Sequence, residues 1–326
     1  MKLNLSKPIH LLSLFVCSML ILSGCSPGSQ EQAAEEAANP NLEFTDYDNL
    51  KLGFTTQNFL AAMPVSLETS KQFIDYGAEQ GYAWLELRDP NAELSVEESQ
   101  EIAAYAQEKD IEVSYAIQKG LLDDDFWPTF EKGLQNAVVF EGPKLIRSLA
   151  SLSEFASDAV KQGWTQEELA LAVQHADSAA ALANEAGLQY VVENGGEPFF
   201  GQGEQYFGVA DLFAQAGEQV GWQFDTANPF SVARVHGAAD SVRNFLQANI
   251  SNLYYIHLKS AQNGQAQEVL GENPLPLPEV LKLLSEHSVS YVAIELQAVD
   301  NQEQAFANQE QSLTYLQSQN LVKKAQ

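Results

Sequence analysis

Eight short apolar runs, separated by longer segments, are the feature that most restricts how this chain can fold. Each run is rich in β-branched and aromatic residues, which is typical of a strand. The runs are Leu50–Phe59, Tyr82–Leu87, Ile111–Ile117, Lys144–Leu149, Leu188–Glu193, Gly221–Asp225, Leu253–Leu258 and Tyr291–Leu296. Strands joined by segments of helical length pair in parallel, because parallel pairing requires a long crossover connection. The alternation therefore predicts an α/β fold with a parallel sheet.

The segments between these runs carry helix signals. Apolar residues recur at helical spacing in Leu67–Gln80, Val96–Lys109, Gln166–Ala186, Ala238–Ala248 and Pro278–His287. Capping boxes at Ser95 with Glu98 and at Thr165 with Glu168 predict two helix starts. Three glycines lie between a helical segment and the next run, where a left-handed C-cap is expected: Gly81, Gly187 and Gly221.

Two architectures accommodate this alternation: an open doubly wound sheet and a closed (β/α)8 TIM barrel. An open sheet usually carries a glycine-rich phosphate loop after its first strand, and residues 53–57, Gly-Phe-Thr-Thr-Gln, do not form one. No linker-like composition divides residues 42–326, and their number suits one barrel. The sequence therefore predicts a single (β/α)8 barrel domain over residues 42–326.

The first residues have the character of an export signal. Lys2 and Lys7 give a positively charged segment before the apolar run Leu11–Leu22. This run is shorter than the roughly 20 residues that span a bilayer, but it suits a signal peptide. The run ends in Leu22-Ser-Gly-Cys25, which resembles the lipobox of bacterial lipoproteins. The resemblance implies a signal peptide over residues 1–24, cleavage before Cys25 and lipid attachment to its thiol. An ordinary signal peptide or a short anchor is the alternative.

The residues after this motif predict how the domain is held. Residues 25–41 are rich in Ser, Gln, Glu, Ala and Asn without an apolar period, which is typical of a flexible tether. Ser26, rather than Asp, implies transfer to the outer membrane in Gram-negative lipoproteins. We therefore expect a domain in the bacterial cell envelope, lipid-anchored to the outer membrane and facing the periplasm, whose only membrane contact is its N-terminal lipid. With Cys17 removed and Cys25 acylated, no thiol remains for a disulfide, a metal or catalysis.

The charge of the chain restricts its partners. The sequence has 44 acidic and 17 basic residues, a net charge of −27. So acidic a surface repels phosphate backbones and anionic lipid heads, which argues against nucleic acid as a partner.

Four of the late runs carry an ionisable residue at their end or one position before it: Glu193, Asp225, His257 and Glu295. The first three are each 32 residues apart and the fourth follows 38 residues later, so each step is about one strand–helix unit. In a barrel the carboxyl ends of all strands meet at one mouth, where barrel enzymes have their active sites. Taken singly, such a Glu is usually solvated and such a His is usually hydrogen-bonded in the core. Four in register predict a shared site.

The composition of this set favours a metal. Three carboxylates packed together would each resist ionisation, and a divalent cation removes that conflict. Three oxygen ligands and one imidazole suit Mn²⁺ best, with Mg²⁺, Zn²⁺ and Co²⁺ as alternatives. The sequence therefore predicts one divalent metal ion.

Six segments resemble motifs of the xylose isomerase-like TIM barrel superfamily, which contains sugar and sugar-phosphate isomerases and epimerases and endonuclease IV-like proteins. The segments are Tyr82–Arg88, Val192–Asn194, Asp225–Asn228, His257–Lys259, Leu270–Leu281 and Val292–Glu295. The resemblance extends from Leu50 to about Asn320. Each motif is weak alone, but the ordered set is specific to the superfamily and not to one substrate.

The resemblance implies that the four strand-end residues bind one Mn²⁺-like ion and that Glu193 and Glu295 also act as the acid/base pair. Five further residues at or near strand ends are candidates for substrate binding: Glu86, Arg88, Asn194, Asn228 and Lys259. Arg147 is a weaker candidate of the same kind, with salt bridging at the barrel rim as the alternative role for such charges.

Three positions depart from the family pattern. Asn228 lies where many epimerases have a substrate-binding His, and Ser260 follows Lys259 where Asp is common. Residues 114–116, Ser-Tyr-Ala, contain no His, so the multi-zinc site of the endonucleases is not expected. Together with the acidic charge, this argues against DNA repair.

The resulting prediction is a metal-dependent isomerase or epimerase that moves a proton next to a carbonyl in a sugar, keto-sugar or sugar acid. A lyase or hydrolase that acts on an oxidised sugar or glycoside by the same enolate chemistry is one alternative. A non-catalytic sugar-binding barrel is another, although paired Glu193 and Glu295 argue for catalysis. The sequence leaves the substrate and the oligomeric state open.

Overall fold

Eight strands close into a barrel in which every neighbouring pair is parallel, as the alternating sequence predicts. The computed structural model describes residues 41–150, 162–195, 198–231, 239–287 and 289–325. In spatial order the barrel strands are β11 (Tyr291–Ile294), β2 (Lys51–Thr55), β3 (Trp84–Arg88), β4 (Glu112–Gly120), β5 (Leu145–Leu149), β6 (Gln189–Glu193), β7 (Val220–Asp225) and β8 (Leu253–Leu258). The chain is a (β/α)8 barrel.

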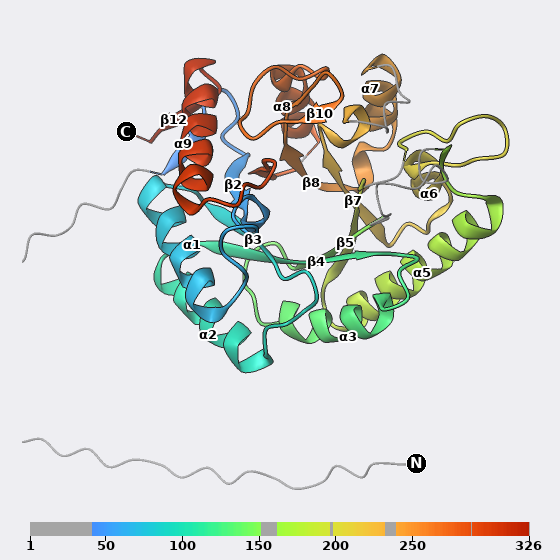
Figure 1. The fold of residues 1–326 in the computed structure, drawn as a ribbon, viewed down its shortest axis with the longest axis horizontal. Helices are drawn as coiled ribbons and strands as arrows, with labels where there is room; N and C mark the ends of the chain where they lie inside the picture. The colour runs from blue at the N-terminus through green and yellow to red at the C-terminus, as the bar shows by residue number, and fades with distance from the viewer. Residues whose placement is uncertain (1–40, 151–161, 196–197, 232–238, 288, 326) are drawn as a thin grey trace, which may run out of the picture. The chain divides into compact units, whose positions relative to one another are not determined.

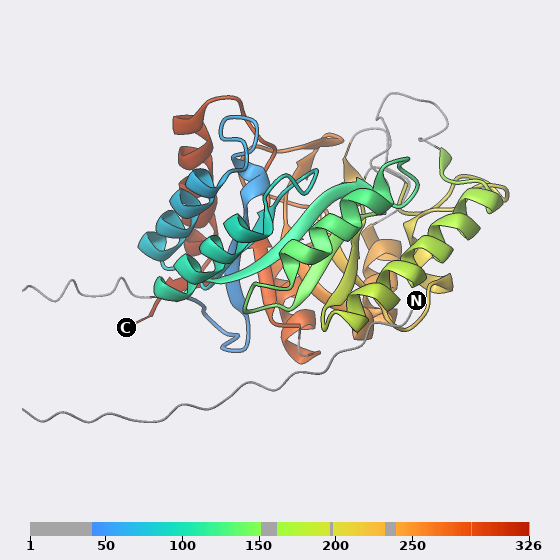
Figure 2. The ribbon, with the colours of Figure 1, turned by 90° about the horizontal axis from the view of Figure 1, so that it is seen from below.

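Helices surround the strands and follow one another around them in chain order (Figure 1). They are α1 (Leu67–Gln80), α2 (Val96–Glu108), α3 (Phe126–Ala137), α5 (Gln166–Glu185), α6 (Val209–Gln215), α7 (Ala239–Ala248), α8 (Leu277–Glu286) and α9 (Gln302–Ser318). Figure 2 shows the green helices of the middle of the chain lying along the outside of the strands. Among the described residues, no helix combines the length and the apolarity that a bilayer crossing requires.

Several short elements complete the domain. Strand β1 (Leu42–Phe44) pairs antiparallel with β12 (Val322–Lys324), and β9 (Ala261–Gln262) pairs with β10 (Gln265–Ala266). Short 3₁₀ helices are η1 (Thr56–Asn58), η2 (Asn228–Phe230) and η4 (Ile250–Asn252). The predicted signal peptide, Cys25 and nearly all of the tether lie outside the described residues, so these remain predictions.

The two capping boxes and two of the three glycine C-caps are confirmed, while some strand bounds differ, as in β4, which extends to Gly120. Both predicted capping boxes form, and Gly81 and Gly187 have the left-handed φ angles of 88° and 77°. The first strand is shorter than predicted, because the Thr55 side chain accepts a hydrogen bond from the backbone of Gln57 and starts η1. Gly221 lies within β7 and is not a C-cap. A Cβ there would be 2.5 Å from the Tyr254 ring, so glycine is needed because it lacks a Cβ and not because of its φ angle.

Gly53 in β2 provides a test of packing at the bottom of the barrel. A Cβ there would lie 2.5 Å from both the indole Nε1 and the backbone oxygen of Trp84, and that indole donates to the Lys51 carbonyl. We expect Gly53→Ala to lower the free energy of unfolding by about 1–3 kcal/mol, since the backbone oxygen cannot move away. Urea denaturation measures this loss. Gly271→Ala is the control, because its nearest neighbour is 3.8 Å away; equal stability of the two variants would contradict the packing argument.

Inside the barrel, an apolar layer lies beneath a polar one. Five inward side chains form a small apolar cluster: Trp84, Leu145, Val191, Tyr255 and Ala293. Since side chains alternate along a strand, the next inward residue lies two positions further toward the mouth. Two positions beyond these five residues lie, in the same order, Glu86, Arg147, Glu193, His257 and Glu295. The same alternation thus places ionisable groups together directly above an apolar floor.

Candidate metal centre

Glu193, Asp225, His257 and Glu295 converge at the carboxyl end of the barrel. Each offers one ligand atom, and these four atoms lie within 4.8 Å of one another. Glu193 and Asp225 are the last residues of β6 and β7, His257 lies in β8, and Glu295 directly follows β11. All four side chains are buried. The structure therefore brings together the four residues that the sequence predicts as ligands.

The turn after β7 holds Asp225 by one of its two oxygens. Oδ1 accepts hydrogen bonds from the backbone nitrogens of Ala227 (2.7 Å) and Asn228 (2.8 Å). Oδ2 is buried without a hydrogen-bond partner and lies 3.5 Å from Nζ of Lys259. One oxygen is thus fixed by the backbone while the other faces the site.

Two asparagines connect the ends of β6 and β7 around Asp225. The Asn194 side chain accepts from the Asp225 nitrogen at 2.7 Å and donates to its carbonyl at 3.1 Å. Asn228 in turn donates from Nδ2 to the Asn194 carbonyl at 2.8 Å. These contacts fix the position of the aspartate. Contact of Asn194 or Asn228 with a substrate stays a prediction.

The His257 ring faces two different carboxylate groups. Its Nε2 lies 3.2 Å from Oε2 of Glu86, on the side away from the other three ligands. Its Nδ1 lies 2.7 Å from Oε2 of Glu295 and 3.6 Å from Oε1 of Glu193, without hydrogen-bond geometry. Burial would lower the pKa of His257, but Glu86 and Glu295 hold it well above its usual value. The raised pKa means that a proton on the imidazole is stabilised by these carboxylates. A metal ion bound at Nδ1 would be stabilised by the carboxylates of Glu295 and Glu193 in the same way.

Two of the four candidate ligands have a buried atom that lacks a hydrogen-bond partner in the described part of the chain: Asp225 Oδ2 and His257 Nδ1. Buried polar atoms are nearly always hydrogen-bonded, so two such atoms within one cluster favour a further partner between them. Carboxylate oxygens and one imidazole nitrogen are suitable donors for Mn²⁺, Mg²⁺ or Zn²⁺. The residues present therefore fit a divalent metal ion.

Glu86 is the centre of the layer that supports these ligands. It is fully buried, and five side chains contact its carboxylate: Thr55 (2.9 Å), Arg88 (3.0 Å) and Arg147 (3.0 Å) at Oε1, and Tyr255 (2.5 Å) and His257 (3.2 Å) at Oε2. Burial alone would raise the pKa of Glu86, but Arg147, His257 and Arg88 hold it well below its usual range. Such contacts favour a positioning role: an acceptor at Nε2 fixes the ring so that Nδ1 faces the site. The predicted contact of Glu86 with substrate stays untested.

Two buried arginines connect Glu86 with the ligands. Arg147 places Nη2 3.0 Å from Glu86 and Nη1 2.8 Å from Oε2 of Glu193. Arg88 places Nη2 3.0 Å from both Glu86 and Glu295. Arg147 has no exposed surface and Arg88 only 3%, so neither forms a salt bridge at the solvent-facing rim.

Sequence reasoning missed Thr55 and Tyr255, which both donate to Glu86. Each carries a usable signal, since Thr55 ends its strand and Tyr255 lies two residues before His257 on the same inward face. A residue two positions before a candidate ligand lies on the same face of the strand and can contact the groups that position that ligand.

Solved structures with the same fold include several sugar-converting enzymes. A D-psicose 3-epimerase with D-tagatose from Clostridium cellulolyticum H10 has a TM-score of 0.58 at 14% identity, covering 82% of this chain and 99% of its own. A sugar phosphate isomerase/epimerase from Parabacteroides distasonis ATCC 8503 has a TM-score of 0.56 at 14% identity, covering 84% and 98%. A xylose isomerase-like TIM barrel protein from Mycobacterium smegmatis, in complex with magnesium, has a TM-score of 0.56 at 15% identity, covering 82% and 97%.

The chain has the xylose isomerase-like barrel fold. No family model matches the sequence, and the comparison with curated proteins found no match. At identities of 14–15% the likeness establishes the fold, and the chemistry has to be argued from the site itself.

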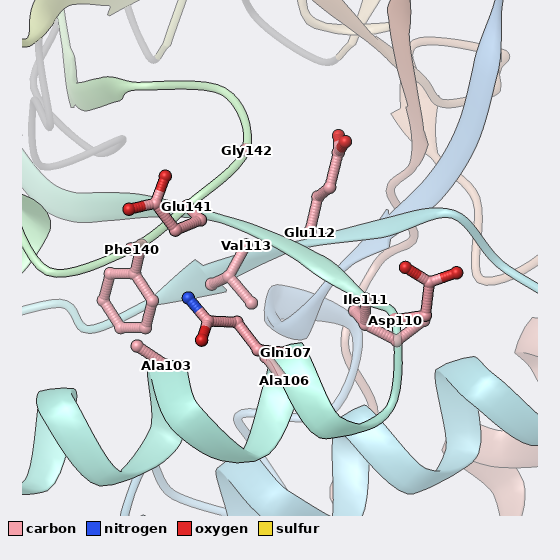
Figure 3. Close-up of a pocket in the computed structure, with 10 residues that line it drawn as sticks. All are labelled: Ala103, Ala106, Gln107, Asp110, Ile111, Glu112, Val113, Phe140, Glu141 and Gly142. Carbon is pink, nitrogen blue, oxygen red and sulfur yellow. The ribbon is translucent and has the colours of Figure 1, made fainter.

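A hollow of about 220 Å³ lies elsewhere, between α2, the start of β4 and the residues before β5 (Figure 3). Its acidic side chains include Glu112 and Glu141, which pair with Lys51 and Lys144 respectively. Glu112 also accepts from Tyr291. The hollow is near the amino ends of the strands, away from the mouth of this xylose isomerase-like barrel, and none of the four candidate ligands lines it.

The pKa of Asp225 predicts how metal binding depends on pH. Burial raises this pKa to about 6; Lys259 opposes the shift, and Glu295 and Glu193 add to it. Below pH 6 the carboxyl is protonated in the metal-free protein, so a cation must displace a proton to bind. We expect the Kd for Mn²⁺ to rise about tenfold per pH unit below 6 through this group. Calorimetric titration from pH 5 to 8 measures it, and a constant Kd over that range would contradict the assignment.

Proposed function

We propose that this protein is a divalent-metal-dependent isomerase or epimerase that moves a proton next to a carbonyl in a sugar, keto-sugar or sugar acid. One observation carries the proposal: the ligand atoms of Glu193, Asp225, His257 and Glu295 converge at the mouth of the barrel, and buried atoms of Asp225 and His257 there lack hydrogen-bond partners. Solved structures with the same fold include D-allulose 3-epimerase from Methylomonas sp. in complex with D-allulose, which supports this substrate class.

The metal would be held by Glu193, Asp225, His257 and Glu295. When bound, a divalent ion supplies stabilisation of the negative charge that develops on the substrate oxygens when a proton leaves the adjacent carbon. We propose Mn²⁺, because three carboxylates and one imidazole combine hard ligands with a borderline one. A structure of this fold in complex with magnesium keeps Mg²⁺ as the other candidate.

Glu193 and Glu295 are the proposed acid/base pair. They come from β6 and β11, which are separated in the barrel by β7 and β8, so they can approach a substrate from different sides. Burial would raise the pKa of both carboxyls, but Arg147 lowers that of Glu193 and Lys259 lowers that of Glu295. Both are therefore ionised at neutral pH, which is the form that a general base requires. One removes the proton as a carboxylate. The other takes up a proton from solvent and delivers it from the opposite face or to the neighbouring carbon, and the first then loses its proton to solvent.

The test combines elemental analysis with exchange of solvent deuterium. The purified protein is stripped with a chelator, reloaded with Mn²⁺ and incubated in D₂O with a panel of ketoses and sugar acids. After removal of the metal, proton NMR of the sugars is expected to show deuterium at a carbon next to the carbonyl, and stripped protein should give none. Exchange that persists after stripping would refute metal dependence. Metal binding without exchange on any sugar would favour the non-catalytic sugar-binding barrel.

We also propose that this chemistry takes place in the cell envelope, with the domain attached through lipid on Cys25. The support is the sequence alone: the apolar run, the lipobox-like motif and the polar tether. Labelling of growing cells with a fatty-acid analogue should mark the wild-type protein and not Cys25→Ser. Equal labelling of the two would exclude this anchor.

A further inference from the structure

Lys259 directly follows β8 and contacts the metal-ligand carboxylates. Its Nζ donates a hydrogen bond to Oε1 of Glu295 at 2.8 Å and lies 3.5 Å from Oδ2 of Asp225. The side chain is 11% exposed, whereas that of Arg147 is fully buried. It thus contacts two of the four candidate ligands, and one of those contacts is to the unpartnered oxygen of Asp225.

The other two cations of the site are held differently. Arg147 and Arg88 both pair with Glu86, beneath the ligands, and Arg88 also donates to Gln57. Nothing described pairs Lys259 with Glu86. Each guanidinium group therefore pairs with Glu86 as well as with a candidate ligand, whereas the two salt bridges of Lys259 are both to candidate ligands.

The charges of the cluster nearly balance in this state. Four carboxylates, from Glu86, Glu193, Asp225 and Glu295, face Arg88, Arg147, Lys259 and the His257 imidazole, whose pKa is held well above its usual value. A divalent ion added to this cluster brings two more positive charges within a few ångströms of the ammonium. Repulsion at such a distance in a buried site is strong, and a lysine can turn away because its charge is carried on a flexible four-carbon chain.

We propose that Lys259 is an internal counter-ion of the metal-free site, which a divalent metal displaces from Asp225 and Glu295. The lysine therefore competes with the metal, and in the loaded site its ammonium is free to face the mouth. The loaded site then carries more positive than negative charge, which suits the negative charge that develops on a substrate during proton transfer. This inference rests on the metal centre of the proposed function.

If Lys259 only positions Glu295, its removal is expected to change metal affinity in the opposite direction. If the ammonium only held Glu295 in place for the metal, removing it would weaken metal binding. If it competes with the metal, removing it strengthens binding, because no cation has to leave the ligands. Metal affinity therefore separates the two roles without any measurement of activity.

The experiment compares Mn²⁺ affinity in wild type, Lys259→Met and Lys51→Met. All are titrated in a calorimeter at pH 8, where Asp225 is ionised. Lys51→Met removes the same charge from a lysine that pairs with Glu112, outside the ligand set. We expect Lys259→Met to bind Mn²⁺ about tenfold more tightly than wild type, and Lys51→Met to stay within about twofold.

Thermal unfolding supplies a second measure on the same proteins. Without metal, Lys259→Met should melt below wild type, because two buried carboxylates lose their counter-ion; with saturating Mn²⁺ it should melt at least as high. Should that variant not fold, Lys259→Gln keeps a hydrogen-bond donor for Glu295 and is subject to the same expectations. Unchanged or weaker Mn²⁺ binding by the neutral variant overturns the inference. Absence of Mn²⁺ binding by wild type would instead refute the proposed function on which it rests.

Discussion

Replacing Glu295 by Gln is expected to slow the exchange of a substrate proton with solvent by about two to four orders of magnitude. The amide cannot accept a proton, so the variant lacks one member of the acid/base pair. Lys259 and Arg88, which donate to the two oxygens of Glu295, would also face a neutral group. The measurement is the initial rate of deuterium incorporation by NMR at saturating Mn²⁺.

Two controls make this result interpretable. Elemental analysis must show that Glu295→Gln still holds its metal, because Glu295 is also a candidate ligand. Glu279→Gln removes the same charge from a largely exposed carboxylate that pairs with Arg243, and it should exchange like wild type. Glu193→Gln is expected to behave like Glu295→Gln. Near wild-type exchange by either site variant with metal retained would exclude its assigned role.

The four ligands could be predicted from sequence because each is specified locally. A strand of a parallel barrel is a short apolar run, and the inward-facing residue nearest its carboxyl end lies at the mouth. Leu253–Leu258 was predicted with the bounds that β8 has, and His257 followed from it. The spacing of about one strand–helix unit then placed Glu193, Asp225 and Glu295 in the same ring. No knowledge of distant contacts was required.

The supporting layer could not be predicted in this way, because its pairs join distant strands. Tyr255 and Glu86 are 169 residues apart, and Arg88 and Glu295 are 207 apart. The sequence shows a Glu at the end of a strand but not the five groups that contact it. It therefore suggested substrate binding for Glu86, where the contacts favour a positioning role. The C-cap prediction at Gly221 was wrong because the Tyr254 ring that packs there comes from the neighbouring strand.

The buried layer also explains how the site tolerates so many charges. Ion pairs removed from water lose hydration, and they persist only where each charge has good partners. Arg147 meets this condition through Glu86 on one nitrogen and Glu193 on the other. Glu86 therefore links the two arginines, one ligand imidazole and the apolar floor through Tyr255. It is the residue whose loss should disturb stability and metal binding together.

Glu86→Gln is expected to lower the free energy of unfolding by about 3–5 kcal/mol, the usual cost of removing one partner of a buried charge pair. Gln has nearly the same shape, so the loss would not come from a cavity. Thr55, Arg88 and Arg147 contact one oxygen of Glu86, and Tyr255 and His257 contact the other. An amide nitrogen at either position would face groups that donate, and Arg147 would lose its partner at Glu86 in a site with no exposed surface.

The same substitution should weaken Mn²⁺ binding by about 10–100-fold, because His257 loses the acceptor that orients its ring. Urea denaturation of the metal-free protein and calorimetric titration at pH 8 measure the two effects separately. Tyr255→Phe is the matched control: it removes one donor to Glu86 but leaves both arginines and the imidazole paired, so its losses should be clearly smaller. If Glu86→Gln were as stable as wild type, the ion-pair layer would not support the barrel. If it were destabilised but bound Mn²⁺ normally, Glu86 would stabilise the fold without positioning His257.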